Sequence, residues 1–131
     1  MAAAHTPLVM TGNQTTAAAV FEAVNLTLRG NVFSAIAVPP GTVLVISSIS
    51  IASIAGPSLW SLDCSTDGIN FTPVAEMHAL DVAVPPGPIY NFNVALAFNG
   101  NAGPDVRIAL LVLTSGGPTQ VTCTITGYTE P

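Results

Sequence analysis

The residues best suited to chemistry lie in the sequence DCSTDGINF at positions 63–71. Their aspartates and glycine partly match a calcium-binding loop of the type D-x-[DN]-x-[DN]-G-x5-E. Such a loop also needs an acidic or amide side chain at the position of Ser65 and a glutamate at the position of Val74. Neither is present, and Glu76 lies two residues too far along the chain. We therefore predict no metal site in this segment.

The same segment is better explained as a β-hairpin. Asp67-Gly68 is a strong turn dipeptide, and it stands between two strand-like stretches, Trp60–Ser65 and Ile69–Val74. We therefore expect the aspartate and glycine to shape a connection between two antiparallel strands.

Other titratable residues offer little for catalysis. Glu76, His78 and Asp81 have the types needed for a carboxylate–imidazole site, but a solvated loop explains them more simply. His5 falls in the N-terminal segment. The sequence also has no G-x-S-x-G motif and no glycine-rich loop for phosphate. We predict that the protein is not an enzyme, with no catalytic, cofactor-binding or metal-binding residue.

The two cysteines, Cys64 and Cys123, both fall at positions expected to face inward. They either form a disulfide or remain two buried thiols that act as small apolar residues. The order of Trp60 and Tyr128 around them does not follow the immunoglobulin pattern.

The elements that must position these residues are strands. Val, Ile and Thr together number 37, against five for Glu, Lys and Arg, and frequent turns are supplied by 11 Gly and 11 Pro. Apolar and polar residues alternate in several segments. The clearest are Val24–Leu28, Trp60–Ser65, Tyr90–Asn99 and Val121–Thr126. The sequence therefore predicts an all-β fold, an antiparallel β-sandwich that is jelly-roll-like and has about seven or eight strands.

Two segments depart from simple alternation. The pattern of Thr42–Ile54 shifts by one residue across Ser47-Ser48, which predicts a β-bulge. Val106–Leu113 is apolar on both faces, which predicts a central strand or one covered on its outer side.

Charge is scarce along the whole chain. Only nine of 131 residues are charged, none is lysine, and the net charge is −5. A typical protein carries about 25% charged residues, whereas this one carries 7%. A monomer of this size exposes on the order of 6,400 Å², a surface with few charges to oppose association. We therefore expect a homo-oligomer, with a trimer as the favoured state.

Two classes of partner are excluded by the same features. Only Arg29 and Arg107 could neutralise phosphates, so we predict no nucleic-acid binding. The charge-free stretches 30–62, 82–104 and 108–129 are long enough to span a bilayer, but turn-forming residues divide them. The N-terminus lacks the features of a secretory signal. We therefore expect a soluble protein with no membrane segment and no targeting segment, or one whose signal has been removed.

The N-terminal residues lack clean alternation. We expect residues 1–19 to form an arm and residues 20–131 to form one sandwich domain. With Leu8, Val9 and Met10 as its apolar anchor, this arm is predicted to contact a neighbouring subunit and not to complete its own sandwich.

The chain resembles the small jelly-roll accessory proteins of tailed-bacteriophage virions. The residues that carry this resemblance are Phe33, Val38-Pro39-Pro40-Gly41, Leu44-Val45-Ile46, Ile49-Ser50 and Ile125-Thr126-Gly127-Tyr128. Two departures are the proline pair in place of a single proline, and Thr42 where a basic residue is usual. The resemblance implies a decoration or cement subunit of the virion that binds other virion proteins such as the major capsid protein.

A second class of function is a carbohydrate-binding or adhesive module, which would be extracellular. It would need Trp60, Tyr90 and Tyr128 to stack on sugars. Trp60 and Tyr90 fall at inward-facing positions, which favours the structural function instead.

Overall fold

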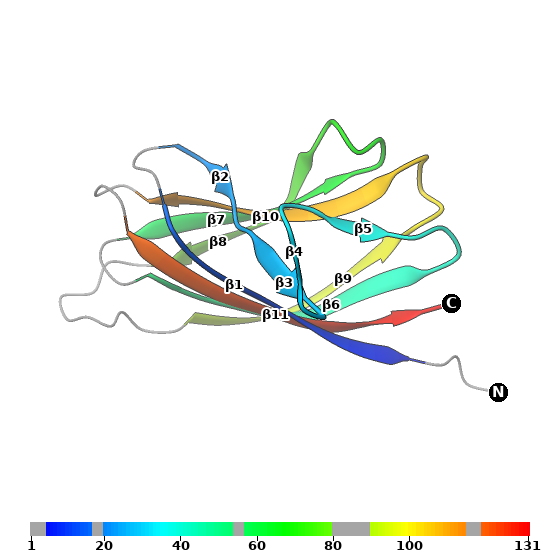
Figure 1. Ribbon diagram of the computed structural model, residues 1–131, viewed down its shortest axis with the longest axis horizontal. Helices are drawn as coiled ribbons and strands as arrows, with labels where there is room; N and C mark the ends of the chain where they lie inside the picture. Colours follow the sequence, from blue (N-terminus) through cyan, green and yellow to red (C-terminus); the bar gives the residue numbers. More distant parts are fainter. Residues whose placement is uncertain (1–4, 17–19, 54–56, 80–89, 115–118) are drawn as a thin grey trace.

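The protein is a sandwich of two antiparallel β-sheets (Figure 1). The computed structural model describes residues 5–16, 20–53, 57–79, 90–114 and 119–131, and these contain eleven strands and no helix. The strands are β1 (Thr6–Thr15), β2 (Glu22–Ala23), β3 (Leu26–Leu28), β4 (Asn31–Phe33), β5 (Ile36–Val38), β6 (Val43–Ser53), β7 (Ser58–Ser65), β8 (Thr72–Ala79), β9 (Tyr90–Asn99), β10 (Val106–Thr114) and β11 (Gln120–Glu130). The predicted all-β sandwich is confirmed.

The order of the strands is that of a jelly roll. The first sheet, sheet A, has the order β4-β3-β1-β11-β6-β9, and the second, sheet B, has the order β2-β10-β7-β8, with β5 also pairing with β10. The first long strand thus pairs with the last, and successive strands cross between the sheets as in two Greek keys. More strands are present than the seven or eight predicted, because β2, β3, β4 and β5 are short pieces of two or three residues.

The N-terminal segment is part of this sandwich, which corrects the sequence-based expectation. All ten residues of β1 pair with β11, from Thr6 opposite Thr129 to Thr15 opposite Gln120. Leu8 and Met10 point into the core, and Met10 is completely buried. The prediction of a separate arm over residues 1–19 is therefore wrong for Thr6–Thr15, while residues 1–4 and 17–19 lie outside the described residues.

The alternation of β1 is hidden in the sequence by Gly12. This glycine occupies an inward position, where an added Cβ would lie 2.6 Å from Cγ1 of Val24 and 2.8 Å from Sγ of Cys123. Only a residue without a side chain fits between these neighbours. The inward-facing residues of β1 are therefore Leu8, Met10 and Gly12. The glycine interrupts the row of apolar side chains by which a strand is recognised in a sequence.

The alternating segment Val24–Leu28 is not one strand. Glu22–Ala23 pairs with β10 in sheet B, and Leu26–Leu28 pairs with β1 in sheet A. The chain crosses the edge of the sandwich between them, with the N–H of Val24 donating to the carbonyl of Leu110. Val24 and Leu26 both face the core, each at 0% exposure, so the pattern of burial is preserved although the strand is broken.

Three other local predictions are confirmed. The register of β6 against β11 shifts at Ser47, which places the β-bulge where the pattern changes parity. β10 lies inside sheet B, with β7 on one side and β2 and β5 on the other. β7 and β8 pair antiparallel across the loop that contains Asp67-Gly68, as expected for a hairpin.

The core between the sheets contains Trp60, Leu62, Leu110 and Ile125, all at 0% exposure. Cys64 of sheet B packs against this core and Cys123 of sheet A is buried within it, and both thiols are free. The disulfide alternative is therefore not realised. Burial raises the pKa of the Cys123 thiol to about 12, so it is neutral at physiological pH.

Candidate assembly surfaces

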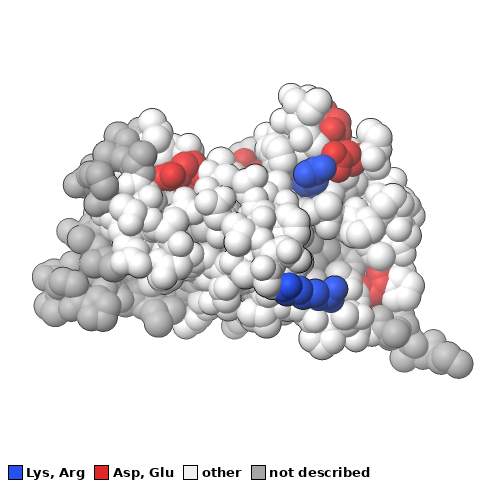
Figure 2. All heavy atoms as spheres, in the orientation of Figure 1, with Lys and Arg blue, Asp and Glu red and all other residues white. Residues whose placement is uncertain are grey.

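The protein has few charges, and none of those described lies in the middle of the outer face of sheet A, whereas Asp63 and Glu76 line a hollow in the outer face of sheet B. Asp105 and Arg107 form an ion pair beside the loop of Asp67, and Arg29 lies in the turn between β3 and β4. Asp63 is only 7% exposed. Figure 2 shows that the visible face is mostly uncharged, with small separate groups of red and blue atoms. Asp81 lies outside the described residues.

The middle of the outer face of sheet A is a polar surface without charge, and Glu130 lies at one end of this face, where it is paired with His5. Its outward side chains form rows across the strands, and one such row is Thr11, Thr124, Ser50 and Asn91. Neighbours in these rows bond to each other, since the hydroxyl of Ser50 donates to Oδ1 of Asn91 and the hydroxyls of Ser48 and Thr126 share a hydrogen bond. This face offers hydrogen-bonding groups but no ionic contact to a partner.

The outer face of sheet B is more apolar. Leu59, Leu111 and Leu113 point outward from β7 and β10 and are half-buried. Beside them lies Phe21, which is 46% exposed, and Val74 on the neighbouring strand β8 is 44% exposed. A shallow hollow of about 230 Å³ opens on this face. Its lining residues are Phe21, Leu59, Ser61, Asp63, Pro73, Glu76 and Leu111. The hollow is suited to an apolar side chain of a partner protein.

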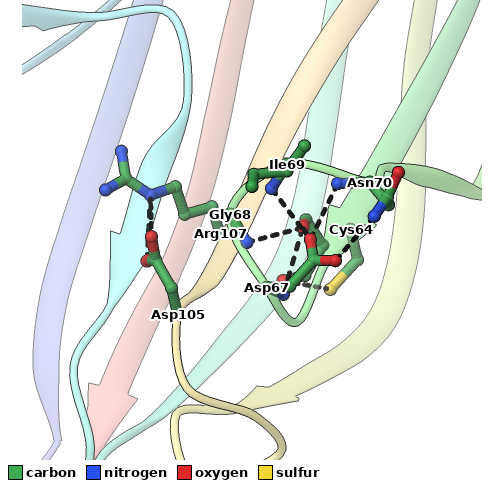
Figure 3. Close-up of polar contacts among 8 residues, drawn as sticks. Cys64, Asp67, Gly68, Ile69, Asn70, Asp105 and Arg107 are labelled. Atoms are coloured by element: carbon green, nitrogen blue, oxygen red, sulfur yellow. Dashed lines mark hydrogen bonds and ion pairs between the residues drawn. The ribbon is translucent and has the colours of Figure 1, made fainter.

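The loop between β7 and β8 is held together by Asp67 (Figure 3). Its Oδ1 accepts hydrogen bonds from the backbone N–H of Asn70 at 2.7 Å and of Ile69 at 2.8 Å, and from the hydroxyl of Ser65 at 2.9 Å. Oδ2 accepts a further bond from the side-chain amide of Asn70. These donors, with Asn70 first, hold the pKa of the Asp67 carboxyl well below its ordinary value.

The Asp67 carboxylate is thus occupied by the loop's own donors. Within the described residues, no group of three His, Cys, Asp or Glu side chains is placed to hold a metal ion. The structure therefore gives this aspartate a structural task, namely closing the hairpin connection.

A second strand end lies against this loop. Nε of Arg107 is 2.9 Å from Oδ1 of Asp105, and the N–H of Asp105 donates to the carbonyl of Thr66. Gly68 has a φ of +78°, and an added Cβ there would lie 2.2 Å from Oδ2 of Asp105. The sequence identified the turn at Gly68 but not its contact with Asp105, because the two are far apart in the chain.

The other candidate catalytic residues do not form a described site. Glu76 and His78 are exposed on strand β8, so the expectation of a loop at these two residues is wrong. His5 stacks on Tyr128 with ring centroids 4.4 Å apart, and its Nε2 lies 2.9 Å from Oε2 of Glu130. These contacts tie the beginning of β1 to the end of β11.

The hairpin formed by β3 and β4 was not predicted from the sequence. Arg29 and Gly30, with φ of +51° and +81°, make the two-residue turn that suits the twist of a hairpin. Val32 and Phe33 on its second strand are 64% and 41% exposed. A glycine between two short alternating stretches is the signal that would have identified it.

The chain matches no model of a known protein family, and no curated protein shows significant similarity to it. Among the described residues, no helix has the length and apolar character needed to cross a membrane.

Proposed function

We propose that the protein is a non-enzymatic structural subunit that associates with itself and with a larger protein shell, as a decoration or cement protein of a bacteriophage capsid does. One observation carries this proposal. The middle of the outer face of sheet A lacks the charges that normally keep protein surfaces apart, and the outer face of sheet B retains half-exposed leucines beside Asp63 and Glu76. Depletion of charge is typical of the centre of protein–protein interfaces.

The jelly-roll strand order is consistent with this function but does not select it, because one fold supports many functions. The N-terminal segment contributes no support as a docking arm, since Thr6–Thr15 belong to sheet A. The two faces and their composition are therefore what the proposal depends on.

The alternative of a carbohydrate-binding module is disfavoured by the positions of the aromatic residues. Trp60 is completely buried, and its Nε1 donates to the hydroxyl of Ser58 inside the protein. Tyr90 packs against the core, and the ring of Tyr128 is stacked on His5. Trp60 is thus enclosed, and the rings of Tyr90 and Tyr128 are both used in contacts within the protein.

Light scattering on the purified protein tests self-association. We expect a mass of more than one chain at micromolar concentration, and further association when purified capsids that lack accessory proteins are added. The proposal would be refuted if the protein were monomeric at high micromolar concentration and did not bind to the capsids. Specific binding to an immobilised glycan would favour the alternative.

A further inference from the structure

Strand β9 forms an open edge of sheet A. It is the last strand in the sheet order, and on its outer side it pairs with no described strand (Figure 1). It is ten residues long and contains neither a charged residue nor a proline. An edge of this length presents a row of unpaired backbone groups to solvent, which is a template for pairing with another strand.

The other sheet edges carry features that discourage such pairing. β4 at the opposite edge of sheet A has three residues, and β2 and β5 in sheet B have two and three. β8 contains Pro73, an irregular register next to it, and the exposed charge of Glu76. Short strands, prolines, bulges and charges are the usual means by which proteins protect edges. Among the described edge strands, β9 is long and contains neither a proline nor a charged residue.

The inward side chains of β9 are incompletely covered. Tyr90, Phe92, Val94 and Leu96 all pack against the core but are only half-buried. On the adjacent strand β6, the inward residues Ile46, Ile49 and Ile51 are at most 1% exposed. A further strand beside β9 would cover the remaining apolar surface of its inward row and extend the core.

We propose that β9 of one copy pairs antiparallel with β9 of a second copy, about a two-fold axis perpendicular to sheet A and near Ala95. Two six-stranded sheets would then form one continuous sheet of twelve strands. This proposal rests on the proposed self-association and names the contact responsible for it.

The composition of β9 favours a second copy over an unrelated partner. In a two-fold contact each strand meets itself, so a charge near the axis would face an identical charge, which is destabilising. β9 has none, whereas recognition of a different partner normally uses complementary charges. With Ala95 on the axis, Val94 stands opposite Leu96 and Phe92 opposite Phe98 on the inward side, and Asn91 stands opposite Asn99 and Asn93 opposite Ala97 on the outward side, so no charge or bulky apolar side chain is opposed on the outward side. The burial pattern of β9 alternates without interruption, although its register against β6 shifts opposite Ser47.

A contact of this kind closes with two copies. It gives a dimer, or a larger assembly with an even number of chains. The trimer expected from the sequence rested on low charge alone, which carries no information about symmetry. The number of chains in the oligomer therefore distinguishes the β9 contact, which requires an even number, from the trimer.

The test compares the oligomeric mass of the wild-type protein with Ala95→Lys, Ala95→Glu and an equal mixture of the two variants. Ala95 is exposed, so either side chain fits the folded monomer. Thr122→Lys is the matched control, because Thr122 is exposed on the same sheet but on β11, which is paired on both sides. Thermal unfolding followed by circular dichroism checks that each variant is folded.

We expect an even copy number for the wild type, at least about tenfold weaker association for each Ala95 variant alone, and recovery in the mixture, where opposite charges meet. Thr122→Lys should associate like the wild type. Undiminished association of Ala95→Lys, an odd copy number, or no recovery in the mixture would overturn the β9 contact and leave the proposed self-association standing. A monomeric wild type would overturn both.

Discussion

Gly68 and Gly30 have nearly the same φ angle in different surroundings. Their φ angles are +78° and +81°, a region that residues with a side chain rarely adopt. An added Cβ at Gly30 meets nothing within 4 Å, whereas at Gly68 it meets the side chain of Asp105. The same residue type therefore serves only the turn in one case, and the turn plus a contact between two loops in the other.

This difference predicts unequal costs for two alanine substitutions. Gly30→Ala should lower the free energy of unfolding by about 1 kcal/mol, the cost of the left-handed conformation alone. Gly68→Ala should lower it by about 2–3 kcal/mol, because Asp105 must also be displaced. Urea unfolding measures both values. Adding Asp105→Ala should remove part of the extra cost at Gly68, and equal losses at the two glycines would contradict this account.

Strand β1 joins β11 and β3 in sheet A. It pairs along its whole length with β11 and by two residues with β3, so it lies inside sheet A. Neighbouring residues on it differ sharply, since Met10 is completely buried and Val9 is 53% exposed. A segment with this pattern belongs to the folded domain.

Substitutions on β1 test this placement. Met10→Ala should lower the free energy of unfolding by about 2–5 kcal/mol, because it leaves a cavity in the core. Val9→Ala, next to it on the same strand, should change stability by less than about 0.5 kcal/mol, because Val9 faces outward. Chemical denaturation of the two variants gives the comparison. A small effect at Met10 would mean that β1 is an arm after all.

The distribution of charge over the whole protein influences how two copies associate. The net charge is −5, yet the middle of the outer face of sheet A is neutral. Attraction between such faces does not depend on ion pairs, and the net negative charge opposes association only through long-range repulsion.

Association should therefore not weaken with salt. Ionic screening removes repulsion between chains of net charge −5 but leaves backbone pairing and apolar contact intact. Raising sodium chloride from about 0.05 to 1 M should leave the oligomeric mass unchanged or shift the equilibrium toward the oligomer. Light scattering across this range is the measurement, and dissociation at high salt would show that ionic contacts hold the assembly together.

Elements whose sequence signal is local could be predicted from the amino-acid sequence. The abundance of Val, Ile and Thr set the all-β class, alternation located Tyr90–Asn99, and Asp67-Gly68 identified the hairpin between β7 and β8. The parity change at Ser47-Ser48 even located a bulge. Each of these depends on residues within about ten positions of one another, so backbone geometry alone connects pattern to structure.

The order in which the strands lie beside each other could not be predicted from the sequence and is seen only in the folded protein. The pairing of β1 with β11 joins opposite ends of the chain. Gly12, which lies close to Val24 and Cys123, interrupts the apolar alternation from which β1 could have been predicted. The edge position of β9 also could not be predicted. The sequence shows that this strand has no charge and no proline, but not that it pairs with a described strand on one side only. Long-range pairing depends on the summed burial of many side chains from separate segments, and that sum exists only once the two sheets have packed together.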